Sequence, residues 1–135
     1  MARILIAEDE ETLSYLMAAA ISDRGHSVDV SPDGEHALNT LQTGERYDLL
    51  ITDIKMPKMD GRQLIEAVQK QKRLADLPII IMSGYVGMAE LDDLLEAGAI
   101  AFLSKPVNLT VLEEYINFAI KGRATCSTGQ TEETT

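Results

Sequence analysis

Five short strand-like runs alternate with five amphipathic stretches along this 135-residue chain, and this alternation limits the fold more than any other feature. The first run is "RILIA" (Arg3–Ala7), and the others occupy residues 26–30, 47–53, 77–84 and 99–106. Short apolar runs bounded by glycine, proline or acidic residues are typical of buried strands. Two of them contain the continuous apolar segments "YDLLI" and "PIIIM", which are expected where helices cover both faces of a parallel sheet.

The stretches that follow these runs have apolar residues at helical spacing. Such spacing is typical of amphipathic helices that bury one face. Gly25 and Gly44 are placed to end the first two helices, because glycine is favoured just after a helix. The apolar positions that mark the five helices are Leu13, Leu16, Met17, Ala20 and Ile21; Ala37, Leu38 and Leu41; Leu64, Ile65 and Val68; Leu91, Leu94 and Leu95; and Leu112, Tyr115, Ile116 and Ala119.

Five strands, each followed by a helix, predict an α/β fold with right-handed crossovers and a parallel sheet. We expect a flavodoxin-like, doubly wound five-stranded sheet of order 2-1-3-4-5 with five helices, in which the first and third strands flank the switch point. The length of 135 residues fits one domain, which we place at 1–121. Residues 122–135 are rich in Thr, Gly and Ser and are expected to form a disordered polar tail.

The charge of the chain argues against nucleic acid as a partner. Twelve Lys and Arg against 22 Asp and Glu give a net charge of −10, which repels phosphates. No apolar run approaches the roughly 20 residues that cross a bilayer, and the N-terminus does not have the pattern of a signal peptide, so we expect no membrane partner and a cytoplasmic location. Cys126 is the single cysteine and has no partner for an internal disulfide.

Polar side chains stand at the carboxyl ends of four of the five predicted strands. Glu8 and Asp9 follow the first strand, Asp53 the third, Ser83 the fourth and Lys105 the fifth. Taken singly, each has an ordinary explanation as a turn, cap or solvated residue. Ligands in such sheets bind beyond the carboxyl ends of the strands, so the joint pattern favours a functional site.

If the first and third strands are neighbours, Glu8, Asp9 and Asp53 converge. Two unit charges about 4 Å apart repel by roughly 4 kcal/mol at an effective dielectric near 20, so three carboxylates require a cation or a proton. Mg²⁺ suits such a set, because it is held by one or two carboxylates and keeps waters for phosphate oxygens. With Lys105 supplying a further positive charge, Asp53 has the surroundings of a nucleophile that accepts a phosphoryl group.

The segments "AEDE", "DIKMPKMDG", "IIIMSG" and "FLSKP" resemble the receiver domain of two-component response regulators, over about residues 3–121. The resemblance implies that Asp53 is the phosphoacceptor and attacks a phosphohistidine. It implies Mg²⁺ as the cofactor, with Asp9 and Asp53 as ligands and Glu8 assisting directly or through water. The backbone carbonyl of Lys55 is implied as a further ligand, whereas its side chain, two residues past Asp53, has no assigned role.

The resemblance also implies the parts of a switch. Ser83 is the switch hydroxyl, Lys105 pairs with the phosphoryl group, and Phe102 is the aromatic residue that moves inward. The Lys105–Pro106 bond is often cis in this family, and Pro57 and Gly61 shape the loop over the acceptor. Phe102 lacks the hydroxyl of the more common tyrosine, so a switch step that needs that hydroxyl is not expected here.

The expected function is that of a stand-alone receiver that catalyses its own phosphorylation and dephosphorylation but is not an enzyme of metabolism. Its phosphodonor would be a sensor histidine kinase or a histidine phosphotransfer protein. The fourteen residues after 121 are too few for a DNA-binding module, so we expect output through a partner protein or through phosphate relay. The family usually docks partners on the face of the fourth helix, fifth strand and fifth helix, where Phe102, Tyr115 and the exposed side of Met88–Ala97 are candidate contacts.

Three alternatives remain at this stage. A degenerate receiver would act as an interaction module without phosphorylation, but Asp53, the acids and Lys105 are all present. A Mg²⁺-dependent aspartyl-phosphate hydrolase typically has a second Asp two residues after the nucleophile, where this chain has Lys55. A flavin-binding role is weak, because no Ser/Thr-Gly phosphate loop follows the first strand.

Overall fold

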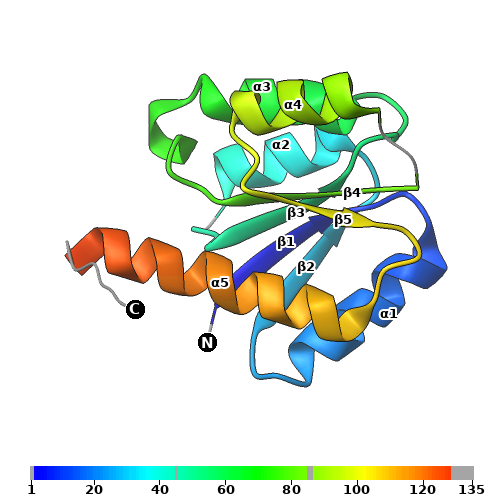
Figure 1. Cartoon of the computed structure of the whole chain (residues 1–135), viewed down its shortest axis with the longest axis vertical. Coiled ribbons are helices and arrows are strands. Elements are labelled where there is room, and N and C mark those ends of the chain that lie inside the picture. Colours follow the sequence, from blue (N-terminus) through cyan, green and yellow to red (C-terminus); the bar gives the residue numbers. More distant parts are fainter. Residues whose placement is uncertain (1, 45, 85–86, 129–135) are drawn as a thin grey trace.

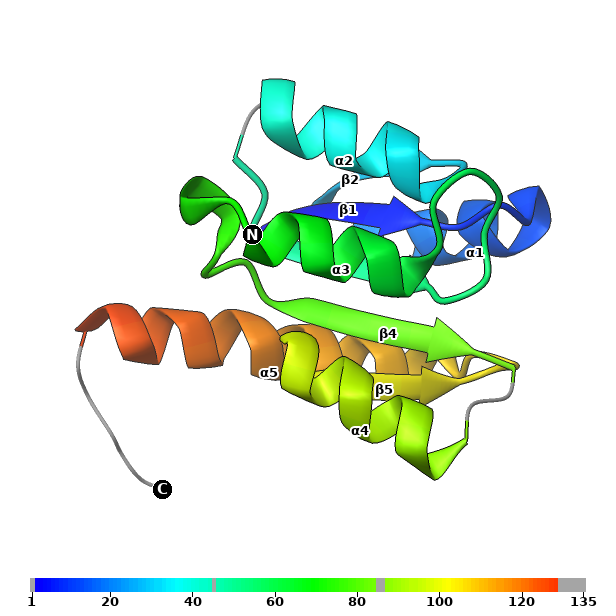
Figure 2. The same ribbon diagram turned by 90° about the horizontal axis from the view of Figure 1, so that it is seen from above.

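The computed structural model describes residues 2–44, 46–84 and 87–128 of the chain. Its strands are β1 (Arg3–Ala7), β2 (Ser27–Ser31), β3 (Leu49–Asp53), β4 (Ile79–Ser83) and β5 (Ala101–Ser104). They form one parallel sheet in the order β2-β1-β3-β4-β5, and Figure 2 shows the arrows of β1, β4 and β5 pointing the same way. The flavodoxin-like order predicted from the sequence is confirmed.

Five α-helices cover the two faces of this sheet. They are α1 (Glu11–Ser22), α2 (Gly34–Thr43), α3 (Gly61–Gln69), α4 (Met88–Ala97) and α5 (Leu109–Thr128). Helices α1 and α5 lie on one face and α2, α3 and α4 on the other (Figure 1). A short 3₁₀ helix, η1 (Lys72–Leu74), precedes β4 and was not predicted. Within the described ranges, no helix has the length and apolarity that crossing a membrane requires.

The central strands β3 and β4 are buried along their whole length, as their continuous apolar sequences predicted. Their side chains alternate between two cores. Ile79 and Ile81 join the core beneath α2, α3 and α4, whereas Ile80 and Met82 join the core beneath α1 and α5. Burying a side chain of this size contributes about 1.5–3 kcal/mol, so these strands anchor the edge of the sheet that carries the polar residues.

The loop between β3 and α3 is closed by specific backbone contacts. Asp60 caps the start of α3 in a capping box: its side chain accepts a hydrogen bond from the Gln63 backbone N–H, and the Gln63 side-chain oxygen accepts one from the Asp60 backbone N–H. The Gly61 N–H donates to the Ile54 carbonyl over 2.7 Å. A side chain at Gly61 would collide with the Asp53 carbonyl oxygen, so glycine is required by this close approach. The predicted role of Gly61 in this loop thus has a structural cause.

The C-terminal helix is longer than the sequence predicted. The predicted polar tail begins at residue 122, whereas α5 continues to Thr128. A helix already nucleated by packed residues extends at little cost, because each added residue forms one more backbone hydrogen bond. Residues 129–135 of the predicted tail lie outside the described residues, so their disorder stays a prediction.

Candidate functional site

The sheet register brings the polar strand ends to one edge. Ala7 of β1 pairs with Thr52 of β3, so the residues that follow them, Glu8 and Asp53, are neighbours. On the other side, Asp53 pairs with Met82 of β4. Because parallel strands all end at the same edge, acids distant in the sequence meet there.

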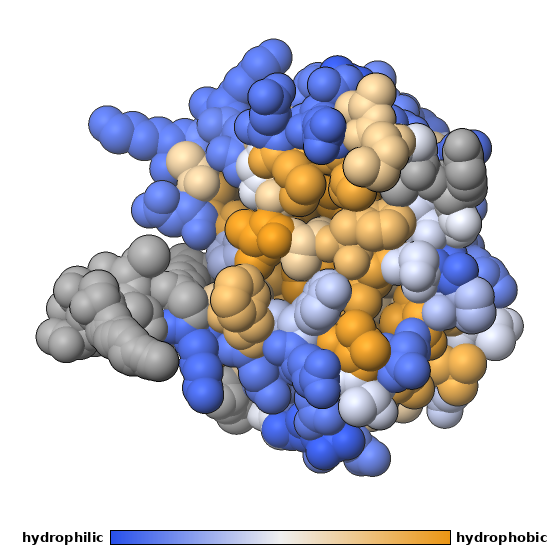
Figure 3. All heavy atoms as spheres, in the orientation of Figure 1, coloured by the Kyte–Doolittle hydropathy of each residue, from blue (hydrophilic) through white to orange (hydrophobic). Residues whose placement is uncertain are grey.

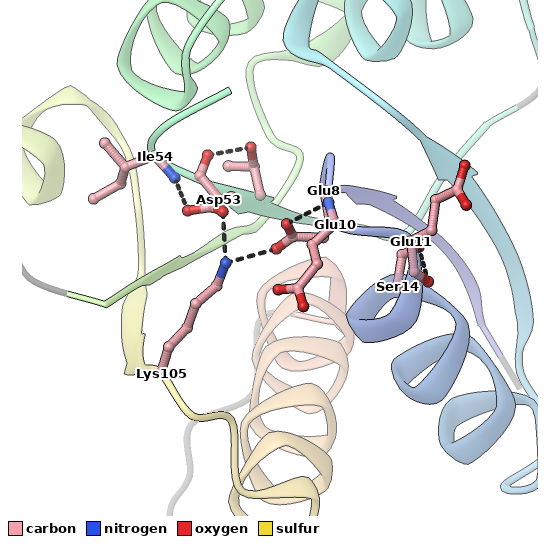
Figure 4. A network of polar contacts seen from close by, with 8 residues as sticks. Glu8, Glu10, Glu11, Ser14, Asp53, Ile54 and Lys105 are labelled. Atoms are coloured by element: carbon pink, nitrogen blue, oxygen red, sulfur yellow. Dashed lines mark hydrogen bonds and ion pairs between the residues drawn. The ribbon is translucent and has the colours of Figure 1, made fainter. Parts of the chain in front are cut away.

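Asp53 is almost completely buried, with 6% of its surface exposed, yet both of its carboxylate oxygens have partners. Oδ1 accepts a hydrogen bond of 2.7 Å from the Ile54 N–H. Oδ2 accepts one of 2.6 Å from the Lys105 ammonium (Figure 4). These contacts offset the cost of burying a charged group and fix the orientation of the carboxylate.

Glu8 is a second buried carboxylate beside Asp53, with 2% of its surface exposed. Its Oε2 accepts a hydrogen bond of 3.0 Å from the Glu10 N–H. Its Oε1 lies 2.9 Å from Lys105 Nζ, in an ion pair without the alignment of a hydrogen bond. Burial raises the pKa of Glu8 and Asp53 adds to this effect, whereas the Glu10 N–H and Lys105 oppose it.

Lys105 therefore bridges two carboxylates at the carboxyl ends of β1 and β3 (Figure 4). Burial by itself lowers the pKa of Lys105, but its interactions with the Asp53 and Glu8 carboxylates outweigh burial, so the pKa is raised and the ammonium stays charged. The residue is held in place by its N–H, which donates to the Ser83 carbonyl over 2.8 Å. The following bond to Pro106 is cis, as the resemblance implied.

Glu8, Asp9 and Asp53 form a carboxylate cluster that fits a divalent cation. Each offers one oxygen, and these oxygens lie within 4.8 Å of one another. Asp9 is exposed whereas the other two are buried, so the cluster opens to solvent on one side. An all-oxygen set with room for water suits Mg²⁺, which retains several waters when bound.

The remaining predicted residues lie outside this cluster, on β4, on β5 and in the loop after β3. Ser83 is the last residue of β4 and is 3% exposed. Lys55 has an exposed side chain in the loop after β3. Phe102 is half-buried on β5, two strands from Asp53, and packs against the core that α3 and α4 cover. The structure thus brings Glu8, Asp9, Asp53 and Lys105 together and leaves Phe102 apart from them.

Three supporting groups were not anticipated from the sequence. The Thr52 hydroxyl is buried and donates to the Asp53 carbonyl oxygen over 2.8 Å. The Ile54 and Glu10 N–H groups hold the two buried carboxylates. The amino-acid sequence does not show where a backbone N–H group will point, so only the folded structure could reveal these two donors.

Comparison with known proteins agrees with this geometry. Residues 4–117 match the response regulator receiver domain family. A chemotaxis protein CheY homolog of Campylobacter jejuni is 32% identical over 113 residues, which are 83% of this chain and 87% of that protein. The transcriptional regulatory protein TcrA of Mycobacterium tuberculosis is 32% identical over 110 residues, which are 82% of this chain but only 42% of TcrA. The chain thus spans less than half of that relative.

Solved structures show the same fold. A CheY-like receiver domain protein from Methanospirillum hungatei superposes with a TM-score of 0.86 at 26% identity, over 93% of this chain and 98% of the other. The chemotaxis protein CheY4 of Vibrio cholerae gives 0.83 at 27% identity, over 88% and 98%. With its matching motifs, sheet order and carboxylate–lysine site, the chain belongs to the response regulator receiver domain family.

Proposed function

We propose that the chain is a stand-alone receiver that accepts a phosphoryl group on Asp53 from a phosphohistidine donor in a Mg²⁺-dependent reaction. The observation that carries the proposal is the buried Asp53 carboxylate, held by the Ile54 N–H at 2.7 Å and by Lys105 at 2.6 Å beside two further acids. A structural ion pair alone would not need the carboxylates of Glu8 and Asp9 as well.

The transfer conserves atoms and charge. A carboxylate oxygen of Asp53 forms a bond to phosphorus while the bond from phosphorus to the donor histidine nitrogen breaks, and that nitrogen keeps the electron pair. The Ile54 N–H holds the carboxylate in one orientation, which reduces the entropy to be lost on reaching the transition state. Lys105 moves from the carboxylate to a phosphoryl oxygen and stabilises the charge that develops there.

Glu8, Asp9, Asp53 and the Lys55 carbonyl would hold the magnesium ion. When bound, it neutralises the carboxylates and the oxygens of the incoming phosphoryl group. Ser83, at the end of β4, donates a hydrogen bond to a phosphoryl oxygen. The inward movement of Phe102 then transmits the effect of this hydrogen bond to the partner-binding face on α4, β5 and α5.

The same proposal covers partners and location. A sensor histidine kinase or a histidine phosphotransfer protein donates the phosphoryl group. A protein partner on α4, β5 and α5 receives the signal, or the phosphate is relayed onward. The chain turns over no metabolite, and we place it in the cytoplasm, where such donors act.

The test is intact mass after incubation with acetyl phosphate, with and without Mg²⁺. We expect one phosphoryl adduct on the wild type that requires the metal and is absent from Asp53→Asn. The matched control is Asp76→Asn, which removes an exposed carboxylate near the start of β4, at the opposite edge of the sheet, and should keep the adduct. No adduct on the wild type would overturn the proposal and leave a phosphorylation-independent interaction module.

A further inference from the structure

One side of α4 is apolar and faces away from α3. Arg62 Nη1 of α3 lies 3.7 Å from Asp93 Oδ2, and this ion pair marks the side of α4 that faces α3. Met88, Leu91 and Leu95 project from the opposite side, since they lie three or four residues apart. Met88 is 77% exposed and Leu95 41% exposed, so this apolar stripe is not covered within the described residues.

The apolar surface continues across β5 and onto α5. Ile100, just before β5, is 42% exposed. On α5, Glu113 forms an ion pair of 2.9 Å with Arg24, which lies in the turn just after α1, and this marks the side of α5 that faces α1. Tyr115 and Phe118 project from the other side, and Phe118 is 65% exposed. We call this surface the edge face, and its main apolar residues are Met88, Leu91, Leu95, Ile100, Tyr115 and Phe118.

Figure 3 shows apolar surface gathered between α4 and α5, with hydrophilic surface above it along α4. The hydrophilic border on α4 is acidic. Glu90, Asp92, Asp93 and Glu96 are all exposed. No lysine or arginine occurs in the sequence between Arg73 and Lys105, and Lys105 is engaged by the carboxylate cluster. The apolar centre of the edge face is therefore flanked by negative charge.

This charge pattern favours one kind of binding partner for the edge face over another. A second copy of the chain would bring the same acidic border, because Glu90, Asp92, Asp93 and Glu96 of α4 are all exposed. Like charges across an interface oppose association, whereas complementary charges favour it and fix its specificity. We infer that the edge face binds a partner segment with apolar anchors flanked by lysine or arginine. This inference rests on the proposed function, since it specifies the chemistry of the partner that receives the signal.

The probes are two synthetic amphipathic helices of about 18 residues with identical leucine positions, one with lysine and one with glutamate at the flanking positions. Binding to the full chain is measured by isothermal calorimetry, and the site by backbone amide shifts. The same samples are phosphorylated with acetyl phosphate and checked by intact mass, and binding is measured in both states. We expect the lysine peptide to bind and to shift amides of α4, β5 and α5, and the glutamate peptide not to bind.

Two double variants distinguish the effect of charge at the edge face on peptide binding from the effect of the overall acidity of the chain. Asp92→Asn with Glu96→Gln removes two charges from α4 and should weaken lysine-peptide binding about fivefold at low salt. Asp23→Asn with Glu35→Gln removes two exposed charges elsewhere and should leave it within about twofold. Leu95→Gln should weaken binding at any salt concentration, because it removes an apolar anchor.

The outcomes are distinguishable. Equal weakening by both charge variants, equal binding of both peptides, or shifts spread over α1 and α2 would overturn the inference. So would self-association of the chain that Leu95→Gln abolishes, since a second copy would then be the occupant. If the phosphoryl adduct forms but neither state binds the lysine peptide, this inference fails and the proposed function stands. If the peptide binds but no adduct forms, the proposed function fails and the docking chemistry stands.

Discussion

Lys105 Nζ lies 2.6 Å from Asp53 Oδ2, although the two residues are 52 positions apart in the sequence. The same ammonium is 2.9 Å from Glu8 Oε1. One cation thus compensates two buried carboxylates, and it already stands where a phosphoryl oxygen on Asp53 would need it. Under the proposed function, stability and reactivity would both depend on the Lys105 side chain.

Replacing this lysine should destabilise the fold. Lys105→Met leaves Glu8 and Asp53 buried beside each other without a cation. We expect a loss of about 1–3 kcal/mol in the free energy of unfolding. This is less than the cost of breaking a fully buried ion pair, because Lys105 is partly exposed. Urea denaturation without divalent metal measures it. Lys121→Met, at an exposed lysine of α5, is the control. The double variant with Glu8→Gln should recover part of the loss, and strictly additive losses would contradict the bridge.

Mg²⁺ should stabilise the chain through Asp9. Because a ligand stabilises the folded state by RT ln(1 + [L]/Kd), the wild type should gain about 2.7 kcal/mol at a hundredfold excess over Kd. Asp9→Asn should lose most of this gain while unfolding like the wild type without metal, since Asp9 is exposed. Glu10→Gln, at the neighbouring exposed acid, should keep the gain. Equal Mg²⁺ effects on all three chains would mean that the carboxylate cluster does not bind the ion.

Gly61 should not tolerate a side chain. The Cβ of Gly61→Ala would meet the Asp53 carbonyl oxygen and the Ile54 Cα, and both are backbone atoms that cannot turn away. We expect a loss of about 1–3 kcal/mol together with slower phosphorylation, because the backbone that carries the acceptor must shift. Gly87→Ala is the control, since no atom of the described residues, apart from its chain neighbours, lies within 4 Å of its Cβ position. Thermal melts and adduct formation measured together check both effects, and a Gly61→Ala chain that behaves like the control would refute the packing argument.

His26 should make the fold sensitive to mild acid. Its Nδ1 accepts a hydrogen bond of 3.0 Å from the Ala2 N–H, and burial lowers its pKa below the usual 6.5, with Glu113 opposing. The folded state then binds the proton less tightly than the unfolded state. Its contribution is therefore complete above the unfolded pKa and is lost as the pH falls from about 6.5 toward the folded pKa. The difference in urea midpoint between the wild type and His26→Gln should shrink from pH 7.5 to 5.5, and a constant difference would rule out this titration.

The proposed movement of Phe102 can be followed directly. The chain has two phenylalanines, so incorporation of fluorophenylalanine should give two ¹⁹F resonances, assigned with Phe118→Leu. Phosphorylation should shift the Phe102 resonance, because its half-buried ring would pack differently. The 65% exposed Phe118 serves as the internal reference. An unchanged Phe102 resonance in a sample whose adduct is verified by mass would exclude the inward movement.

Much of the fold could be predicted because its signals are local. The continuous runs at β3 and β4 and the helical spacing of Leu64, Ile65 and Val68 depend only on which residues must be buried. The meeting of Glu8 with Asp53 followed from one further rule, that parallel strands end at the same edge. The end of α5 was misplaced, because a polar composition does not exclude helix when one already leads into it.

The sequence by itself determined the order of strands and helices, the sheet topology they imply and the identity of the charged residues at the strand ends, because burial and chain connectivity require these. The tertiary structure decided how those charges are shared. It placed Lys105 between Glu8 and Asp53, set backbone N–H groups against both carboxylates and left an acid-bordered apolar surface across α4, β5 and α5. Distances and desolvation between residues far apart in the sequence govern these features, and they exist only once the chain has folded.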